Sequence, residues 1–265
     1  MTDSLIKADI EILKLGDKAI LKDISFALKK GEFIALLGRN GAGKSSFIKN
    51  LTNEIKNNHS EIFYFGRNLK EYKLKELAQK RSVLMQNTHL TFAYDVIDVV
   101  LLGRIPHNHL KHSANYDLEI ARSCLKEVGL EDYEDRNYLT LSGGEQQRVQ
   151  IARTLAQIYD QTQECVFILD EPTNNLDIAY QYHCLKIVKN LSKKGVGVLV
   201  VLHDLNLAAQ FADKVVLFNE GRLELFGVPK DVLTVDNIFR AYGHKVLVLE
   251  HPEGNFPLIV SNYKL

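Results

Sequence analysis

The segment GRNGAGKS, from Gly38 to Ser45, follows the apolar run FIALL and precedes the run SFIKNL. Two glycines five residues apart, followed by Lys and Ser, are typical of a phosphate-binding loop when they lie between a strand and a helix. The glycines let successive backbone N–H groups point at phosphate oxygens, and the following helix adds its N-terminal dipole. We expect Lys44 to reach the β- and γ-phosphates of a nucleotide and Ser45 to bind Mg²⁺. The residues expected to contact the nucleotide are Gly38, Arg39, Asn40, Gly41, Ala42, Gly43, Lys44, Ser45 and Ser46.

An acidic pair ends the apolar run CVFILDE, from Cys165 to Glu171. A carboxylate at the end of a strand, such as Asp170, suits Mg²⁺ directly or through water. Glu171 is placed to orient and deprotonate an attacking water. Alone, such a pair is more often a helix cap, but beside a phosphate loop it predicts a Mg²⁺-dependent nucleoside triphosphatase. The sequence contains no NKxD-type guanine-binding motif, and these two motifs leave a small-molecule kinase open.

A third motif, LSGGEQQR, begins at Leu141 and precedes the helical run VQIARTLAQI. Ser142 and the two glycines that follow form a second anion cradle in front of a helix. One active site does not need two such cradles, whereas two copies of the chain that face each other do. The motif therefore predicts a head-to-tail pair of chains with ATP bound between them.

With these motifs the sequence resembles the ATP-binding cassette (ABC) family over nearly its whole length. The resemblance implies ATP and Mg²⁺ as the bound groups and implies a role for each matching residue. The implied catalytic residues are Glu171, His203 and Gln86, and the implied Mg²⁺ ligands are Ser45, Gln86 and Asp170. The resemblance also implies a signature motif that each copy contributes to the nucleotide of the other, formed by Ser142, Gly143, Gly144 and Glu145. It further implies that the run NNLD is the D-loop, with Asp177 at the seam between the two copies.

Three of these residues have plainer alternative explanations. Gln86 could be a loop amide, Asp177 a helix N-cap, and His203 a hydrogen-bonded histidine at a strand end. Their joint order and spacing favour the ABC roles.

The chain departs from the family at one place, where an aromatic residue usually stacks on adenine. Leu13 falls there, and the surrounding run IEILKLGDKAIL has no aromatic residue, so we expect an apolar base contact only.

The segment after Gln86, with the run VVLLGRIPH, resembles importers of the siderophore, hemin and cobalamin group. In that group this surface receives a coupling helix of the permease. The signature continuation and the tail YGHKVLVLEHPEGNFPLIV resemble the hemin-importing members most. The resemblance implies two permease subunits and, indirectly, a periplasmic or lipoprotein substrate-binding protein. It also implies a peripheral position on the cytoplasmic face of the inner membrane. A ferric-siderophore or cobalamin importer, and a soluble ABC ATPase without a permease, stay open.

The tract HNHLKH places His107, His109 and His112 close together. HxH spacing can chelate a metal or heme iron. No Cys or carboxylate lies within the tract, and its polar composition indicates a solvated segment. We therefore favour a surface segment over a ligand site.

Composition narrows the remaining function classes. The 265 residues contain 33 Lys and Arg and 33 Asp and Glu, and this balance argues against a nucleic-acid partner. The N-terminus lacks a basic stretch followed by an apolar one, so it does not predict a secretory signal. The most apolar run, GVGVLVVL, is much shorter than the roughly 20 residues of a membrane-spanning helix. The odd, widely spaced Cys124, Cys165 and Cys184 fit packing roles in a reducing compartment.

Short, almost continuously apolar runs separated by helical patterns predict a parallel α/β sheet whose strands are buried on both faces. The chemical motifs follow the carboxyl ends of these runs, which is where such sheets bind ligands. The predicted strands are 33–37, 82–85, 165–170, 197–202 and 214–218, and the N-terminus with 62–65 predicts an antiparallel flank. We predict one cassette over residues 1–265 with a P-loop NTPase (RecA-like) core at 1–87 and 161–221. Residues 88–160 form an inserted helical subdomain, and 222–265 form a C-terminal extension.

Overall fold

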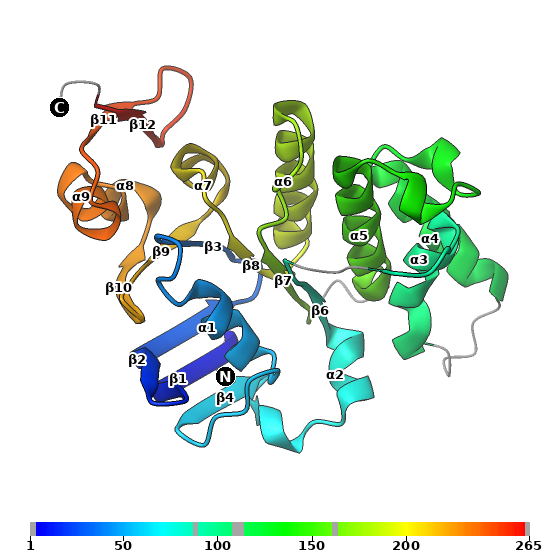
Figure 1. The fold of residues 1–265 in the computed structure, drawn as a ribbon, viewed down its shortest axis with the longest axis horizontal. Coiled ribbons are helices and arrows are strands. Elements are labelled where there is room, and N and C mark those ends of the chain that lie inside the picture. Colours follow the sequence, from blue (N-terminus) through cyan, green and yellow to red (C-terminus); the bar gives the residue numbers. More distant parts are fainter. Residues whose placement is uncertain (1–3, 87–89, 108–113, 161–163, 263–265) are drawn as a thin grey trace. The chain divides into compact units, whose positions relative to one another are not determined.

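The structure is a computed structural model that describes residues 4–86, 90–107, 114–160 and 164–262. It divides into two compact units, one formed by Met1–Glu71 with Gly197–Leu265 and the other by Tyr72–Val196. Figure 1 shows the helices and strands of both units. Within the described ranges, no helix combines the length and the apolar character that crossing a membrane requires.

The first unit contains the predicted antiparallel flank. Its strands follow the order β2-β1-β4-β5. Their bounds are β1 (Ser4–Leu15), β2 (Lys18–Lys29), β4 (Ser60–Tyr64) and β5 (Arg67–Asn68), and the short helix η1 (Leu69–Glu71) follows. Buried and more exposed residues alternate along β4, as expected for a sheet with one face against the core.

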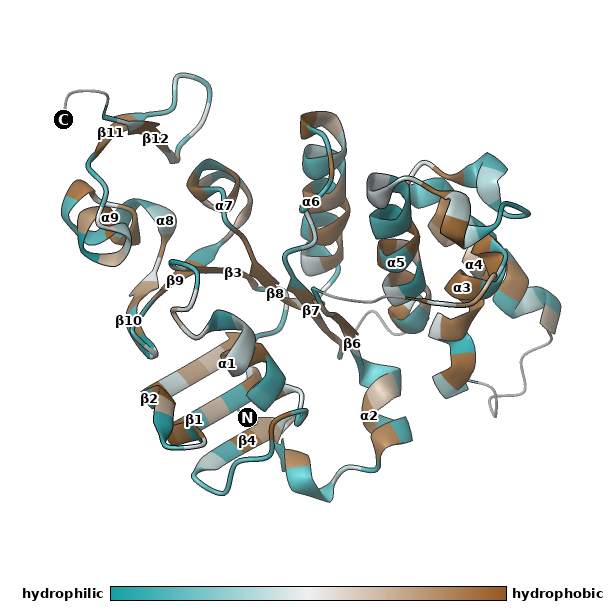
Figure 2. Cartoon of the chain, in the orientation of Figure 1, coloured by the Kyte–Doolittle hydropathy of each residue, from teal (hydrophilic) through white to brown (hydrophobic). Residues whose placement is uncertain are grey.

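The same unit contains parallel strands that position the phosphate loop. Strand β3 (Phe33–Leu37) pairs in parallel with β8 (Gly197–Val201) on one side and with β9 (Lys214–Asn219) on the other. The edge strand β10 (Arg222–Gly227) runs antiparallel to β9. Every residue of β3 and β8 is buried, and both strands are hydrophobic along their length in Figure 2. This confirms the prediction that continuous apolar runs form strands covered on both faces.

Helices follow the carboxyl ends of these strands. Helix α1 (Lys44–Leu51) follows β3, and α7 (Leu205–Phe211) follows β8. The C-terminal extension then adds α8 (Pro229–Val232), α9 (Val235–Tyr242) and a hairpin of β11 (Val246–Glu250) and β12 (Pro257–Ser261). The hairpin strand β12 packs against α7, and β11 packs against α9.

The second unit has a pair of parallel strands, β6 (Arg81–Leu84) and β7 (Val166–Asp170). Strand β6 begins and ends one residue before the predicted run. Between residues 90 and 160 the described part of this unit has helices and turns, with one isolated bridge between Asp95 and Asn137. The helices of the unit are α2 (Leu74–Lys80), α3 (Val96–Leu101), η2 (Leu102–His107), α4 (Ala114–Glu127), η3 (Glu131–Tyr133), η4 (Tyr138–Thr140), α5 (Gly143–Ile158) and α6 (Ile178–Lys193).

The three cysteines are buried packing residues, as the sequence predicts. Burial raises the pKa of each thiol to about 12, so the thiolate form that reacts is scarce at neutral pH.

Candidate functional site

The phosphate loop lies between β3 and α1 in the first unit. Helix α1 begins at Lys44, and the first turn of the helix carries no acidic side chain. Lys44 is only 5 % exposed, and its ammonium donates hydrogen bonds to the carbonyls of Gly38 (2.7 Å) and Arg39 (3.1 Å). The loop therefore places the Lys44 cation at the start of a helix, and this combination is the chemistry of a phosphate cradle.

The backbone around the loop leaves little room at its first glycine. Gly38 has a φ of 146°, and a Cβ atom built there would lie 2.4 Å from the carbonyl oxygen of Phe218 in β9. Any other residue at this position would push the loop off the sheet. The turn after β9 supports the other end of the loop, because the N–H of Gly221 donates to the carbonyl of Ala42 (2.9 Å). The sheet thus fixes the loop at two points.

His203 lies at the edge of the sheet from which the phosphate loop starts. The N–H of Leu202 donates to the carbonyl of Leu36 (3.2 Å), so the ends of β8 and β3 are adjacent. His203 is exposed just beyond this bond. Its position suits a contact with the terminal phosphate, and this role stays a prediction beside the plainer one of a hydrogen-bonded histidine at a strand end.

The acidic pair ends β7 in the second unit. Asp170 and Glu171 are both buried. The amide of Gln86 donates to Oε2 of Glu171 (2.6 Å), and the amide of Asn174 donates to the same oxygen. Glu171 has a φ of 55°, a left-handed conformation that is strained for a non-glycine residue and clusters at functional sites. The carboxylate is therefore held in one orientation.

Asn174, which the resemblance names only as the first residue of the D-loop, is a further functional candidate. Asn174 lies three residues after Glu171, and a turn brings it back to the carboxylate, because the N–H of Asn174 donates to the Glu171 carbonyl (3.2 Å). The structure also joins Gln86 to Glu171, two residues far apart in the sequence.

The predicted Mg²⁺ ligands offer a hydroxyl from Ser45, an amide oxygen from Gln86 and a carboxylate from Asp170. Oxygen donors of these kinds are the ligands that Mg²⁺ prefers, and it completes its octahedron with phosphate oxygens and water. The Gln86 amide nitrogen is bonded to Glu171, which leaves its oxygen as the ligand atom. The chemistry of the donor set fits Mg²⁺.

The signature motif forms the start of α5. Ser142 is the N-cap: its hydroxyl accepts from the N–H of Glu145 (3.3 Å), and the Glu145 carboxylate accepts from the N–H of Ser142 (2.8 Å). The Ser142 hydroxyl also donates to Oε2 of Glu145 (2.7 Å), and this bond, together with the one from the Ser142 N–H, lowers the pKa of Glu145. Ser142 and Gly143 are exposed at the positive end of a 16-residue helix. An exposed helix start of this length can attract a phosphate brought to it by another molecule.

The signature and the D-loop touch each other within the second unit. A Cβ atom on Gly144 would lie 2.8 Å from the carbonyl oxygen of Asn175, so this contact requires glycine. Asp177 accepts a hydrogen bond from the N–H of Tyr180 (3.0 Å) and caps α6. The plainer alternative, a helix N-cap, therefore describes Asp177 in the single chain, while its place at a dimer seam stays a prediction.

Comparison with known proteins identifies the family. A family model described as "ABC transporter" matches residues 21–174, more than half of the chain. The chain belongs to the ABC transporter family. The hemin import ATP-binding protein HmuV of Deinococcus radiodurans is 52% identical over 93% of each chain. The protein of the same name from Methylobacillus flagellatus is 41% identical over 94% of this chain and 93% of its own length.

Solved structures of ABC proteins are similar over most of the chain. One described as a metal-chelate type ABC transporter in an inward-facing conformation has a TM-score of 0.80 and 26% identity, with 99% of both chains covered. A dimeric bacterial ABC transporter cassette has a TM-score of 0.75 and 27% identity, covering 84% of this chain and 98% of that one. The predicted P-loop NTPase fold is thereby confirmed.

The structure corrects one expectation about the ABC nucleotide site. Leu13 is only 1 % exposed and pairs with Leu21 inside the sheet, so it cannot contact a base. Leu15, at the end of the same strand, is 49 % exposed. The adjoining strand β2 reaches the phosphate loop, because a Cβ atom on Gly43 would lie 3.3 Å from the carbonyl oxygen of Ile20. Leu15 is therefore the better candidate for the apolar base contact.

The prediction that the histidine tract is a solvated surface segment is wrong for His107. His107 is fully buried rather than solvated, and its Nε2 lies 2.8 Å from the carbonyl oxygen of Gln157. Burial is the main cause that lowers the pKa of His107. His109 and His112 lie outside the described residues. Among the residues that the structure describes, no cluster of three or more His, Cys, Asp or Glu side chains could hold a metal ion.

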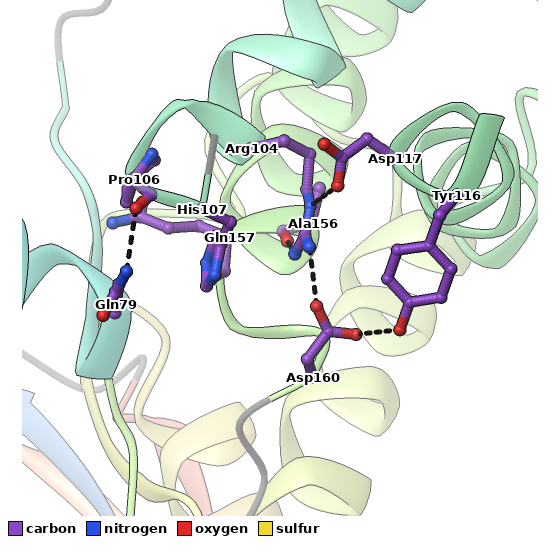
Figure 3. A network of polar contacts seen from close by, with 9 residues as sticks. All are labelled: Gln79, Arg104, Pro106, His107, Tyr116, Asp117, Ala156, Gln157 and Asp160. Atoms are coloured by element: carbon purple, nitrogen blue, oxygen red, sulfur yellow. Dashed lines mark hydrogen bonds and ion pairs between the residues drawn. The ribbon is translucent and has the colours of Figure 1, made fainter. Parts of the chain in front are cut away.

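Close to His107, the buried side chain of Arg104 links several helices of the second unit (Figure 3). Arg104 is 1 % exposed and donates to Asp117 (2.8 Å), to Asp160 (2.6 Å) and to the carbonyl of Ala156 (2.8 Å). The hydroxyl of Tyr116 donates to the second oxygen of Asp160 (2.8 Å). The network joins η2, α4 and the end of α5, and gives the arginine of the VVLLGRIPH run a structural role.

Proposed function

We propose that this chain is the ATP-hydrolysing subunit of a bacterial ABC importer for hemin. The observation that carries the ATPase assignment is Glu171, a buried carboxylate at the end of β7 that two amides hold in a strained, fixed orientation. Relatives that are 40 to 52% identical over more than nine tenths of this chain are named for hemin import, and they support the substrate.

The residues of the phosphate loop, Gly38 to Ser46, bind the triphosphate. The backbone N–H groups and Lys44 neutralise the phosphate charge, and Lys44 exchanges its two loop carbonyls for phosphate oxygens. Ser45, Gln86 and Asp170 would hold Mg²⁺, which when bound supplies charge neutralisation at the phosphate oxygens. His203 contacts the terminal phosphate from the end of β8.

Glu171 takes a proton from the attacking water. Gln86 and Asn174 both donate to Oε2 and so aim the carboxylate toward the attacking water. The strain at Glu171 is consistent with a side chain that the surrounding structure forces into one position.

Two copies of the chain complete the reaction centre. Ser142, Gly143, Gly144 and Glu145 of one copy close the nucleotide of the other in a head-to-tail homodimer, with Asp177 at the seam. This arrangement explains why the signature helix start is exposed in the single chain although its sequence forms an anion cradle.

The proposed helical subdomain, residues 88–160, receives a coupling helix of the permease, so the two copies of the chain serve two permease subunits. Phe92 (69 % exposed), Ile105 and Tyr94 give this region apolar side chains at its surface, which supports a protein partner. A substrate-binding protein acts on the permease without touching this chain. We place the subunit on the cytoplasmic side of the membrane, bound through the permease.

The ATPase proposal is tested with Glu171→Gln in the full chain. The variant keeps ATP binding and loses about 100-fold or more of the turnover, the usual contribution of a general base. Glu164→Gln is the matched control, because Glu164 is an acidic residue of the same unit whose bond to Lys80 is exposed. Wild-type turnover by Glu171→Gln would show that another group takes the proton.

The substrate is tested in liposomes that contain the permease which co-purifies with this chain. Hemin, delivered by its binding protein, stimulates ATP hydrolysis, while a ferric siderophore or cobalamin does not. Stimulation by one of those two compounds would reassign the importer, and recovery of a dimer without any permease would favour a soluble ATPase.

A further inference from the structure

The C-terminal extension reaches the phosphate loop through one side chain. Tyr242, the last residue of α9, accepts a hydrogen bond at its hydroxyl oxygen from the N–H of Gly38 (2.9 Å). The next residue, Gly243, is close to the loop as well: a Cβ atom built there would lie 3.7 Å from Nη1 of Arg39. The first glycine of the loop is thus held between Phe218 on one side and Tyr242 on the other.

The same extension is fastened a second time, close to His203. Asn206 lies in the first turn of α7, three residues after His203. Its amide donates to the carbonyl of Ile259 (3.0 Å) and accepts from the N–H of Ile259 (2.7 Å). The paired bonds tie β12 to α7. In Figure 1 the hairpin lies beside α7, in agreement with the packing of these two elements.

We propose that Tyr242 is a positioning residue for the ATP site, and that the C-terminal extension sets nucleotide affinity by holding the phosphate loop in its binding conformation. The inference rests on the proposed function. A loop that is already ordered loses less conformational freedom when the triphosphate binds, so anchoring Gly38 raises affinity. Asn206 helps to hold the extension in place, because it bonds strand β12 of the extension to α7.

The chemistry of Tyr242 suits an anchor that is independent of pH. Burial raises the pKa of the phenol to about 12, although the bond from Gly38 opposes that shift. The hydroxyl stays protonated and neutral over the physiological range, so it adds no negative charge beside the phosphates. Tyr242 bonds to the loop backbone and acts on ATP only through it.

The test is Tyr242→Phe, which removes one oxygen atom. Tyr64→Phe is the matched control, since the Tyr64 hydroxyl donates to the carbonyl of Leu51 (3.0 Å) at the opposite end of α1. Dissociation constants for MgATP are measured on the full chain, together with KM, kcat and thermal unfolding without nucleotide. Hydrogen exchange of the peptide that contains Gly38 is followed in the same samples.

We expect Tyr242→Phe to raise the Kd and KM about fivefold to tenfold, equal to about 1.0 to 1.4 kcal/mol, with kcat within twofold. Exchange at the loop becomes faster, while Tyr64→Phe loses thermal stability without a change in Kd. An unchanged Kd in Tyr242→Phe, or unchanged exchange at Gly38, would overturn the inference. Failure of the wild type to bind MgATP would instead refute the proposed function.

Discussion

The buried Arg104 network makes a quantitative prediction about the stability of the helical region. In Arg104→Met the side chain keeps its approximate length and loses its charge and donors. Asp117 and Asp160 are left without their cation, and their side chains are only 17 % and 16 % exposed. The carbonyl of Ala156 also loses its donor.

Removing one partner of a buried ion pair costs about 3 to 5 kcal/mol. Both carboxylates keep some contact with water, so we expect the lower end, about 3 kcal/mol, for Arg104→Met. For a chain of this size each kcal/mol lowers the melting temperature by roughly 2 to 4 °C, which gives a fall of roughly 6 to 12 °C. Adding Asp160→Asn to the Arg104→Met variant removes one unpaired charge and recovers part of the lost stability.

The assay is thermal and urea unfolding of the purified chain, followed by circular dichroism. Arg122→Met is the control, because Arg122 also pairs with a carboxylate, that of Glu134, but its side chain is 54 % exposed. Exposed pairs contribute little, so its melting temperature stays close to the wild-type value. A loss in Arg104→Met no larger than that in Arg122→Met, or no recovery on adding Asp160→Asn, would refute the reasoning.

Three further predictions concern pH, base recognition and the dimer. The pKa of His107 lies below its ordinary 6.5 in the folded chain, so the unfolded chain binds this proton first and stability falls as pH drops below about 6.5. His107→Gln should flatten this dependence in urea unfolding between pH 7 and 5, and an unchanged slope would contradict it. Leu15→Tyr should tighten ATP binding about fivefold by adding a stacking surface, measured by titration calorimetry, whereas equal or weaker binding would remove Leu15 from the base site. Ser142→Arg should abolish hydrolysis and leave ATP binding to the single chain intact, and retained hydrolysis would place the signature outside the reaction centre.

The parallel strands could be predicted because their signal is local. Strand β3 begins and ends where the apolar run predicts, since a buried strand needs a continuous run and the glycine loop ends it. The same principle placed Asp170 and His203 at the ends of strands. The resemblance to the ABC family then implied roles for residues whose individual chemistry is ambiguous.

Contacts between distant segments could not be predicted in the same way. Tyr242 ends an amphipathic helix, and nothing in its neighbourhood indicates a bond to Gly38. Counting along the chain placed Leu13 at the position of the family's aromatic residue, but such counting ignores irregularities, and the pairing of β1 with β2 shifts register between Leu13 and Lys14. His107 lies in a polar tract, yet η2 turns it inward against Gln157.

The central claim is that one chain holds an incomplete reaction centre and that a second copy completes it. The most direct measurement is the ATP turnover per chain of the isolated protein as a function of its concentration, with the oligomeric state followed by mass photometry. We expect turnover per chain to fall toward zero as the dimer dissociates. Constant turnover per chain in samples that contain only single chains would contradict it.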